Sequence, residues 1–148
     1  MAISSVLQNT FKEELLGGYH SFNASGDTPA GSAFKIALYT SSADLTTTTT
    51  VYVTSGEVAS GGGYTTAGEA LTNTGVAKST VTSYTDFSDV SWTSATFTAN
   101  GCEIFNDSAT GDPACCTIAF GGDKTVTSGT FTIEFPAASA GSAIIGIA

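Results

Sequence analysis

The stretch that most constrains the fold is an alternating Phe-Lys-Ile-Ala-Leu-Tyr-Thr segment that begins at Phe34. Phe34, Ile36 and Leu38 fall at every second position, so an extended chain carries these three apolar side chains on one face. Two serines then interrupt the pattern, as expected where a strand ends. Lys35 and Tyr39 lie on the opposite face. We therefore predict a core strand whose second face is semi-polar and meets either water or another subunit.

The rest of the chain repeats this kind of pattern, with turn residues between short apolar alternations. Further strands are expected at 76–82, 84–92, 93–99, 102–106, 114–120, 131–135 and 142–148, with a turn at 121–124. This spacing is typical of a mainly β fold, an antiparallel sandwich or small jelly-roll-like barrel of about eight strands. The expected core residues are Phe34, Ile36, Leu38, Trp92, Phe97, Ile104, Phe120, Phe131, Ile133 and Phe135.

One helix is predicted before the strands, over residues 3–16. Its apolar side chains recur mainly every fourth residue, Ser5 and Gln8 fit a capping box, and two glycines follow Leu16. The predicted organisation is an N-terminal helix at 1–18 and a single β domain at 19–148. The helix either packs on its own sheet or docks on a neighbouring subunit through Ile3, Val6, Leu7, Phe11 and Leu15.

Length and charge limit the classes of partner. A chain of 148 residues is long enough to bury a core without metals or disulfides. Its net charge is −9, with four scattered lysines and no arginine, so we expect neither nucleic acid nor an anionic membrane as a partner. No signal peptide or membrane-spanning apolar run is recognisable, which predicts synthesis in a cytoplasm.

The three cysteines and one histidine do not suggest a reactive centre. Adjacent Cys115 and Cys116 would point to opposite faces of a strand, so at most one of them could meet Cys102. We expect free thiols that behave as small core side chains. His20 would have to serve any zinc site and any serine or cysteine nucleophile, and no Gly-x-Ser-x-Gly sequence is present. A structural or exposed histidine is expected.

Paired carboxylates are the remaining route to catalysis. Asp86 with Asp89, or Glu103 with Glu134, could in principle hydrolyse glycosides, since such enzymes use two acidic residues. Core packing of the neighbouring aromatic side chains, beside solvated aspartates, is the favoured interpretation. A sugar-binding role remains the alternative, using these acids with Tyr84, Phe87 and Trp92.

Two further patterns bear on possible ligand sites. Asp86, Asp89, Asp107 and Asp112 leave a calcium site open, although they lack the EF-hand spacing. Three glycines at 61–63 precede no Walker lysine, so they favour a turn or bulge where two backbones approach closely. We predict no catalytic, cofactor-binding or metal-binding residue.

Several segments also share a pattern with a known class of protein. They are FKEELLGGYHSF at 11–22, FKIALYTSS at 34–42, GYTTAGEAL at 63–71, FGGDK at 120–124 and GTFT at 129–132. Together these segments, spread between residues 11 and 147, resemble small virion proteins of tailed bacteriophages, some of which are similar to capsid cement (decoration) proteins. The two cysteines at 115 and 116 depart from that pattern.

The resemblance implies a non-enzymatic structural role without cofactors. It implies binding to the outer face of the major capsid protein shell, self-association as a dimer or trimer, and a place in the virion after synthesis in the host cytoplasm. A tail or fibre-associated virion protein is one alternative, and a carbohydrate-binding module is the other.

Overall fold

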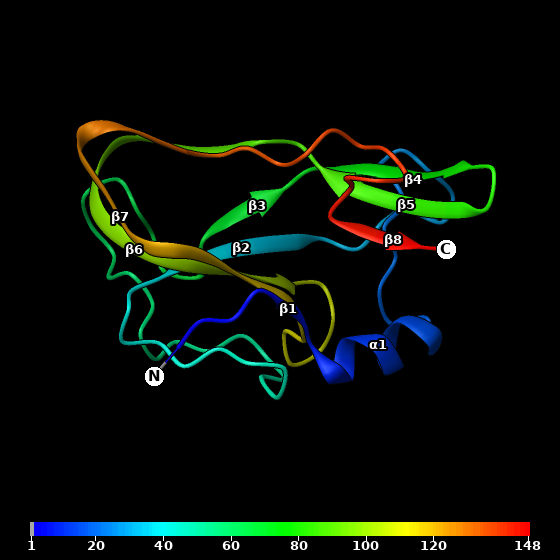
Figure 1. The fold of residues 1–148 in the computed structure, drawn as a ribbon, viewed down its shortest axis with the longest axis horizontal. Coiled ribbons are helices and arrows are strands. Elements are labelled where there is room, and N and C mark those ends of the chain that lie inside the picture. The colour runs from blue at the N-terminus through cyan, green and yellow to red at the C-terminus, as the bar shows by residue number, and fades with distance from the viewer. Residues whose placement is uncertain (1) are drawn as a thin grey trace.

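The computed structural model describes residues 2–148 as one helix and eight strands (Figure 1). The mainly β, antiparallel fold predicted from the sequence is confirmed, and the sheets do not close into a barrel. In chain order the elements are β1 (Val6–Leu7), α1 (Asn9–Leu16), β2 (Phe34–Tyr39), β3 (Glu69–Leu71), β4 (Asn73–Ser79), β5 (Thr82–Phe87), β6 (Val90–Asn106), β7 (Ala114–Ile133) and β8 (Ile145–Ile147).

The strands form two sheets around one long hairpin. The larger sheet has the order β1-β7-β6-β2-β3, and the smaller one has the order β4-β5-β8. In Figure 1, β6 and β7 run together along one side of the molecule, bend at one end and return along the other side. The hairpin therefore contributes to both layers, which gives a sandwich-like arrangement.

The bend in the hairpin comes from extra residues in β7. Ala99 pairs with Lys124 and Gly101 with Ala119, so residues 120–123 of β7 lie opposite a single residue of β6. Extra residues on one strand bend it and increase its twist while the flanking pairs are kept. The turn expected at 121–124 is therefore a corner within a continuous strand. The separate strands expected at 93–99 and 102–106 are the two arms of β6.

The predicted core strand is β2, which lies between β6 and β3 in the larger sheet. Ile36 pairs with Ile104, Leu38 pairs with Cys102, and all four side chains are buried. Of the ten predicted core residues, Phe34, Ile36, Leu38, Trp92 and Ile104 are fully buried, and the other five pack against them half-buried.

The second face of β2 differs from the prediction. Tyr39 is completely buried, in an apolar cluster with Phe105 and Leu45. The chain after β2 folds back over this face, and we call residues 51–58 of it the strap. The strap is bound to β2 and its end by hydrogen bonds from Val58 N to Leu38 O and from Thr40 N to Gly56 O, each 2.9 Å. The expectation that this face meets water or another subunit is wrong at Tyr39.

The predicted helix is also shorter than expected. Residues 3–7 are extended, because the edge of β7 offers them backbone partners: Val6 pairs with Thr117, and Leu7 with Cys116. Ser5 caps no helix, since its hydroxyl accepts a hydrogen bond from Ala119 N at 3.0 Å. The N-terminal segment is therefore built into the β domain.

The helix itself spans two turns, and Gly17 ends it as predicted. Phe11 is its one buried residue and packs against Phe22, with ring centroids 6.1 Å apart. Within residues 2–148, no helix has the length and apolar character needed to cross a membrane.

Candidate functional site

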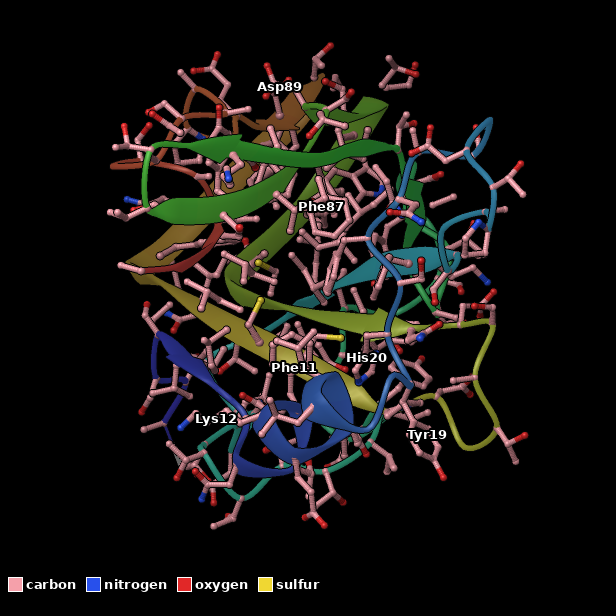
Figure 2. The ribbon with its side chains drawn as sticks, turned by 90° about the vertical axis from the view of Figure 1, so that its right-hand side faces the viewer. Phe11, Lys12, Tyr19, His20, Phe87 and Asp89 are labelled. Carbon is pink, nitrogen blue, oxygen red and sulfur yellow. The ribbon has the colours of Figure 1, made fainter. Side chains whose placement is uncertain are left out.

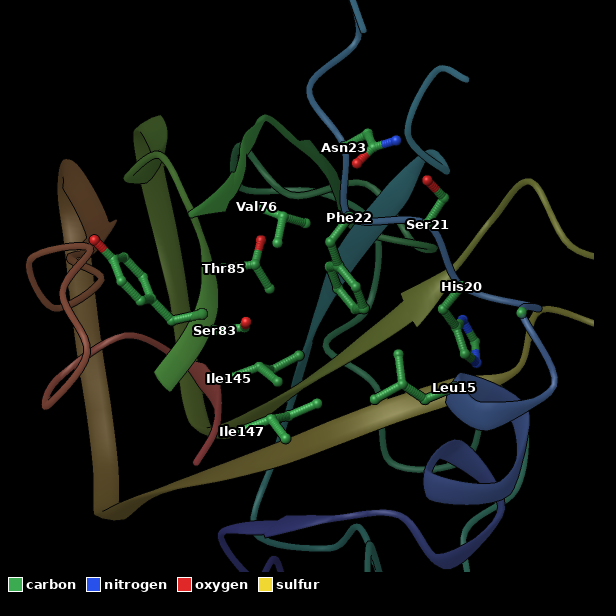
Figure 3. Close-up of a pocket in the computed structure, with 12 residues that line it drawn as sticks. Leu15, His20, Ser21, Phe22, Asn23, Val76, Ser83, Thr85, Ile145 and Ile147 are labelled. Atoms are coloured by element: carbon green, nitrogen blue, oxygen red, sulfur yellow. The ribbon is translucent and has the colours of Figure 1, made fainter. Parts of the chain in front are cut away.

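An apolar groove lies between α1 and the smaller sheet. It has a volume of about 390 Å³. Leu15 and Phe22 line one side, while Val76, Ile145 and Ile147 line the other (Figure 3). The opposing wall is regular because Val76 pairs with Thr85, and Thr85 with Ile145, across three adjacent strands.

Two apolar side chains that line this groove extend into solvent: Val76 is 57% exposed and Ile147 is 59% exposed, both on the sheet side. Leu16 of α1 and Tyr19 are also exposed, at 92% and 67%, but neither lines the groove. Figure 2 looks onto this face, with α1 below Phe11 and His20 and the strands of the smaller sheet above them. An apolar groove with exposed apolar side chains in its wall is typical of a site of interaction. We call this groove, with Leu15, Val76 and Ile147 in its lining, the groove face.

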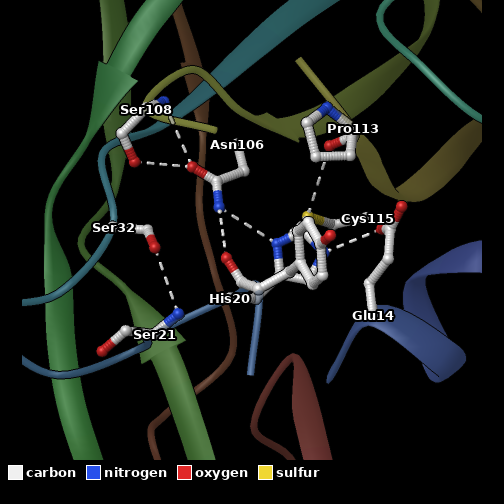
Figure 4. Close-up of polar contacts among 9 residues, drawn as sticks. Glu14, His20, Ser21, Ser32, Asn106, Ser108, Pro113 and Cys115 are labelled. Atoms are coloured by element: carbon white, nitrogen blue, oxygen red, sulfur yellow. Dashed lines mark hydrogen bonds and ion pairs between the residues drawn. The ribbon is translucent and has the colours of Figure 1, made fainter. Parts of the chain in front are cut away.

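His20 lies between the groove and the core. Of the two outcomes predicted for it, structural or exposed, the structural one holds. Its side chain is fully buried. The Asn106 amide nitrogen lies 3.1 Å from Nδ1, and the Glu14 carboxylate lies 2.9 Å from Nε2 (Figure 4). Because an amide nitrogen only donates, Nδ1 must accept, and Nε2 carries the proton that it donates to Glu14.

Asn106 is held in this orientation by its own partners. Its Oδ1 accepts hydrogen bonds from the Ser108 backbone nitrogen and hydroxyl at 3.1 and 2.7 Å, and its Nδ2 also donates to Tyr19 O at 3.2 Å. The amide cannot flip without losing these bonds. The cluster therefore ties the segment after α1 to the end of β6.

Cys115 approaches the same histidine, an arrangement that the sequence did not indicate. Its Sγ lies 3.9 Å from His20 Nδ1 and donates to Pro113 O at 3.8 Å. Burial raises the pKa of this thiol well above its usual value, and Nδ1 is already occupied by Asn106. A nucleophilic thiol needs a lowered pKa and access to substrate, so this contact is one of packing.

The other two cysteines are also buried and free, as predicted. Burial raises the pKa of Cys116 to about 12 and that of Cys102 well above its usual value.

The first predicted pair of acids has a structural role. Asp86 is buried, and its two carboxylate oxygens accept hydrogen bonds from Phe87 N at 2.9 Å and Ile144 N at 3.3 Å. Asp89 accepts one from Phe135 N at 2.9 Å. Both carboxylates therefore hold the chain after β7 against the β5–β6 connection.

The second predicted pair is not brought together. Glu103 is completely buried beneath the strap, whereas Glu134 is exposed beyond the end of β7. Trp92 is only 2% exposed and lies among core aromatic rings, 6.0 Å from Phe131 between centroids. Its indole cannot stack on a sugar at the surface, which removes the basis for the carbohydrate-binding alternative at Trp92.

No predicted calcium site forms within the described part of the chain. Asp107 pairs instead with Lys35 at 3.0 Å. Among residues 2–148, no group of three or more His, Cys, Asp or Glu side chains is placed to hold a metal ion.

The glycine triplet serves close backbone approach, as predicted. Gly62 adopts a φ of +55° and its carbonyl accepts a hydrogen bond from Thr96 N at 2.8 Å. A Cβ at this position would lie 2.3 Å from Thr96 O, so only glycine fits.

The five residues proposed for a docking helix are distributed over different environments. Ile3, Val6 and Leu7 lie in the extended N-terminal segment, and Phe11 points into the core. Only Leu15 lines the groove. Sequence reasoning missed the sheet side of the groove because Val76 and Ile147 lie in short strands whose pairing depends on the tertiary structure.

A second apolar groove, of about 610 Å³, lies beside β7. Its walls come from both arms of the bent hairpin and from the chain after β7, including Ile118, Phe120, Phe131, Phe135 and Ile144.

In comparisons with known proteins, no family model, curated sequence or solved structure matches this chain.

Proposed function

We propose that this protein is a non-enzymatic structural component of a tailed-phage virion, a cement protein that binds the outer face of the capsid shell. The observation that supports this role is the groove face, where half-buried Leu15 of α1 lies across an apolar groove from exposed Val76 of β4 and Ile147 of β8. Binding of a partner that covers this apolar surface is favourable, because the surface is removed from water. The phage character of the partner rests on the sequence resemblance.

The surrounding structure suits a protein that reinforces a shell. The core is continuous between the bent hairpin and β2, and the strap and N-terminal segment cover the outer face of the larger sheet. This packing makes the β domain rigid and leaves the groove face free for binding. The major capsid protein is the proposed partner, and further copies of this chain are proposed to sit beside it on the shell.

Binding to empty, expanded capsids tests this role. The capsids are assembled from the major capsid protein encoded with this chain, and the readout is saturable co-sedimentation. We expect stoichiometric binding by the wild-type protein. We expect Val76→Asp to weaken binding at least about tenfold, since a carboxylate in the buried interface loses its hydration.

Val51→Asp is the matched control. Val51 is 45% exposed but lies in the strap, outside the groove, so this variant should bind as the wild type does. Capsids that bind no wild-type protein would contradict the cement role. Binding to tail preparations instead would assign the protein to the tail.

A further inference from the structure

An unusual cluster of tyrosines and glutamates lies between the strap and the larger sheet. Glu103 of β6 and Tyr39 of β2 are both completely buried there. The Tyr39 hydroxyl oxygen lies 2.9 Å from Glu103 Oε2 and 2.5 Å from Val53 O of the strap. Val53 N lies 3.4 Å from the same Glu103 oxygen. Tyr39 therefore stands between the sheet carboxyl group and the strap backbone.

The number of hydrogens available at this contact favours a protonated Glu103. A phenol carries one proton, and a backbone carbonyl carries none. Tyr39 can therefore satisfy either Val53 O or Glu103 Oε2, but not both. The second short oxygen–oxygen contact needs a proton of its own, and the Glu103 carboxyl group is the only member that can supply it. With that proton, Glu103 donates to Tyr39, and Tyr39 donates to Val53 O.

The neighbouring Glu57 is bonded in the opposite way. Its oxygens face donors only: the hydroxyls of Tyr52 and Tyr64, at 2.5 and 2.7 Å, and Ala67 N at 2.8 Å. Each tyrosine oxygen in turn faces a backbone N–H, from Ala67 or Leu38. Glu57 is thus hydrogen-bonded as an ionised carboxylate, and its negative charge disfavours a second one at Glu103.

We propose that Glu103 is protonated in the folded protein and latches the strap to the sheet through Tyr39, so that loss of this one proton loosens the strap. When Glu103 gives its proton to solvent, the remaining proton of Tyr39 turns toward the new carboxylate. Val53 O then faces a phenol lone pair at 2.5 Å, and the two oxygens must separate. The strap moves because its backbone carries that carbonyl.

The surroundings of Glu103 support the direction of this switch. Desolvation by burial raises the pKa of Glu103, and the charge of Glu57 adds to that rise. Hydrogen bonds from Tyr39 and from Val53 N oppose it, and the resulting pKa is about 7. Glu103 interacts electrostatically or by hydrogen bonding with Tyr39 of β2, with Tyr52 and Glu57 of the strap, and with three thiols of β6 and β7. None of these groups carries a positive charge that would hold an ionised Glu103.

The pH window follows from the two states. In the released strap Glu103 is solvated and ionises near its ordinary value of 4.5, whereas in the latched state it ionises near 7. The opening equilibrium therefore rises by about tenfold per pH unit between these values and levels off above them. The strap is held most tightly at the acidic end of this range.

Two measurements on the full chain test the latch. The first is the ¹³C shift of the Glu103 carboxyl group by NMR, which should show a protonated acid at pH 5.5 and a midpoint near 7. The second is hydrogen exchange at the Val53 amide, corrected for its intrinsic pH dependence, which should rise about tenfold per pH unit from pH 5 to 7.

Glu103→Gln keeps a donor for Tyr39 but cannot ionise, so its strap exchange should not change with pH. Glu134→Gln removes an exposed carboxylate and should respond as the wild type does. An ionised Glu103 carboxyl at pH 5.5 would overturn the latch, as would strap exchange that stays constant while that carboxyl titrates. If Glu103→Gln fails to fold, the two wild-type measurements decide the question alone.

Discussion

At the scale of single residues, buried polar side chains do more than apolar ones to fix how segments meet. Asn106 illustrates this, because its amide bonds His20, the Tyr19 carbonyl and Ser108 at once. A buried polar group that loses its partner bears the full cost of desolvation, which exceeds the gain from making the bond. The orientation of the segment after α1 is therefore decided by one side chain.

Replacing Asn106 with alanine should lower the free energy of unfolding by about 1–3 kcal/mol, because His20 Nδ1 and Tyr19 O lose their donor. Asn100→Ala is the control, since Asn100 bonds only Asp123 at the surface, at 2.8 Å, and should cost less than about 0.5 kcal/mol. Urea denaturation of both variants measures the difference. Equal costs would show that the buried cluster is not a structural lock.

Gly62 sets a second constraint at this scale. Ala at Gly62 would place its Cβ against Thr96 O, whereas Ala at Gly111, whose φ is +86°, meets nothing within 4 Å. Both changes carry the strain of a left-handed backbone, about 1 kcal/mol, so their difference isolates the clash. We expect Gly62→Ala to be the more destabilising by at least about 1 kcal/mol in urea denaturation. Equal values would contradict the close approach of the two backbones.

At the scale of elements, the helix shows how tertiary pairing overrides a local pattern. The i+4 spacing from Ile3 to Leu15 fits a helix of several turns, yet its first part pairs with Thr117 and Cys116 of β7. Extended residues there satisfy backbone groups on an otherwise open strand edge, which a helix would leave unpaired. Only the part from Asn9 onward stays helical, with Phe11 facing inward.

The helix is therefore expected to stabilise its own domain through Phe11. Phe11→Ala should lower the free energy of unfolding by about 3–5 kcal/mol, since the ring is 1% exposed and packs on His20 and Phe22. Leu16→Ala, at a side chain that is 92% exposed, should change it by less than about 0.5 kcal/mol. Thermal and urea unfolding of the two variants provide the measurement. If Phe11→Ala changed the free energy of unfolding only slightly, the docking role of the helix would be favoured instead.

At the scale of the whole molecule, the acidic side chains lie in two environments, the solvated surface and the buried interior. The net charge of −9 is spread mostly over the surface, where water screens it. Glu103 and Asp86 are the buried exceptions, and only Asp86 receives two backbone donors. Glu103 therefore couples folding to pH.

The stability of the wild-type protein should fall as the pH rises from about 4.5 to 7. The pKa of Glu103 rises from 4.5 to about 7 in the folded state, so the folded chain binds this proton more tightly than the unfolded chain does. The full loss across this range is about 3 kcal/mol, from 1.36 kcal/mol per pKa unit. Urea denaturation across this range, compared with Glu103→Gln, measures it. A wild-type slope no steeper than that of the variant would contradict this contribution.

The sequence determined the features that depend on neighbours along the chain. Alternation in β2 identified its buried face, the paired glycines located the end of α1, and the glycine triplet indicated close backbone approach. These signals are local, because side-chain direction and backbone freedom follow from adjacent residues.

Only the tertiary structure decided which distant residues meet. His20 and Asn106 are 86 residues apart, and Tyr39 and Glu103 are 64 apart, so their contacts depend on strand register and not on any spacing along the chain. The same is true of the groove face, where the N-terminal helix region meets strands from the middle and the end of the sequence. It is true also of the second face of β2, which was predicted to be semi-polar because it carries Lys35 and Tyr39 and which is buried at Tyr39. That face is buried because the strap supplies the partner which the hydroxyl requires.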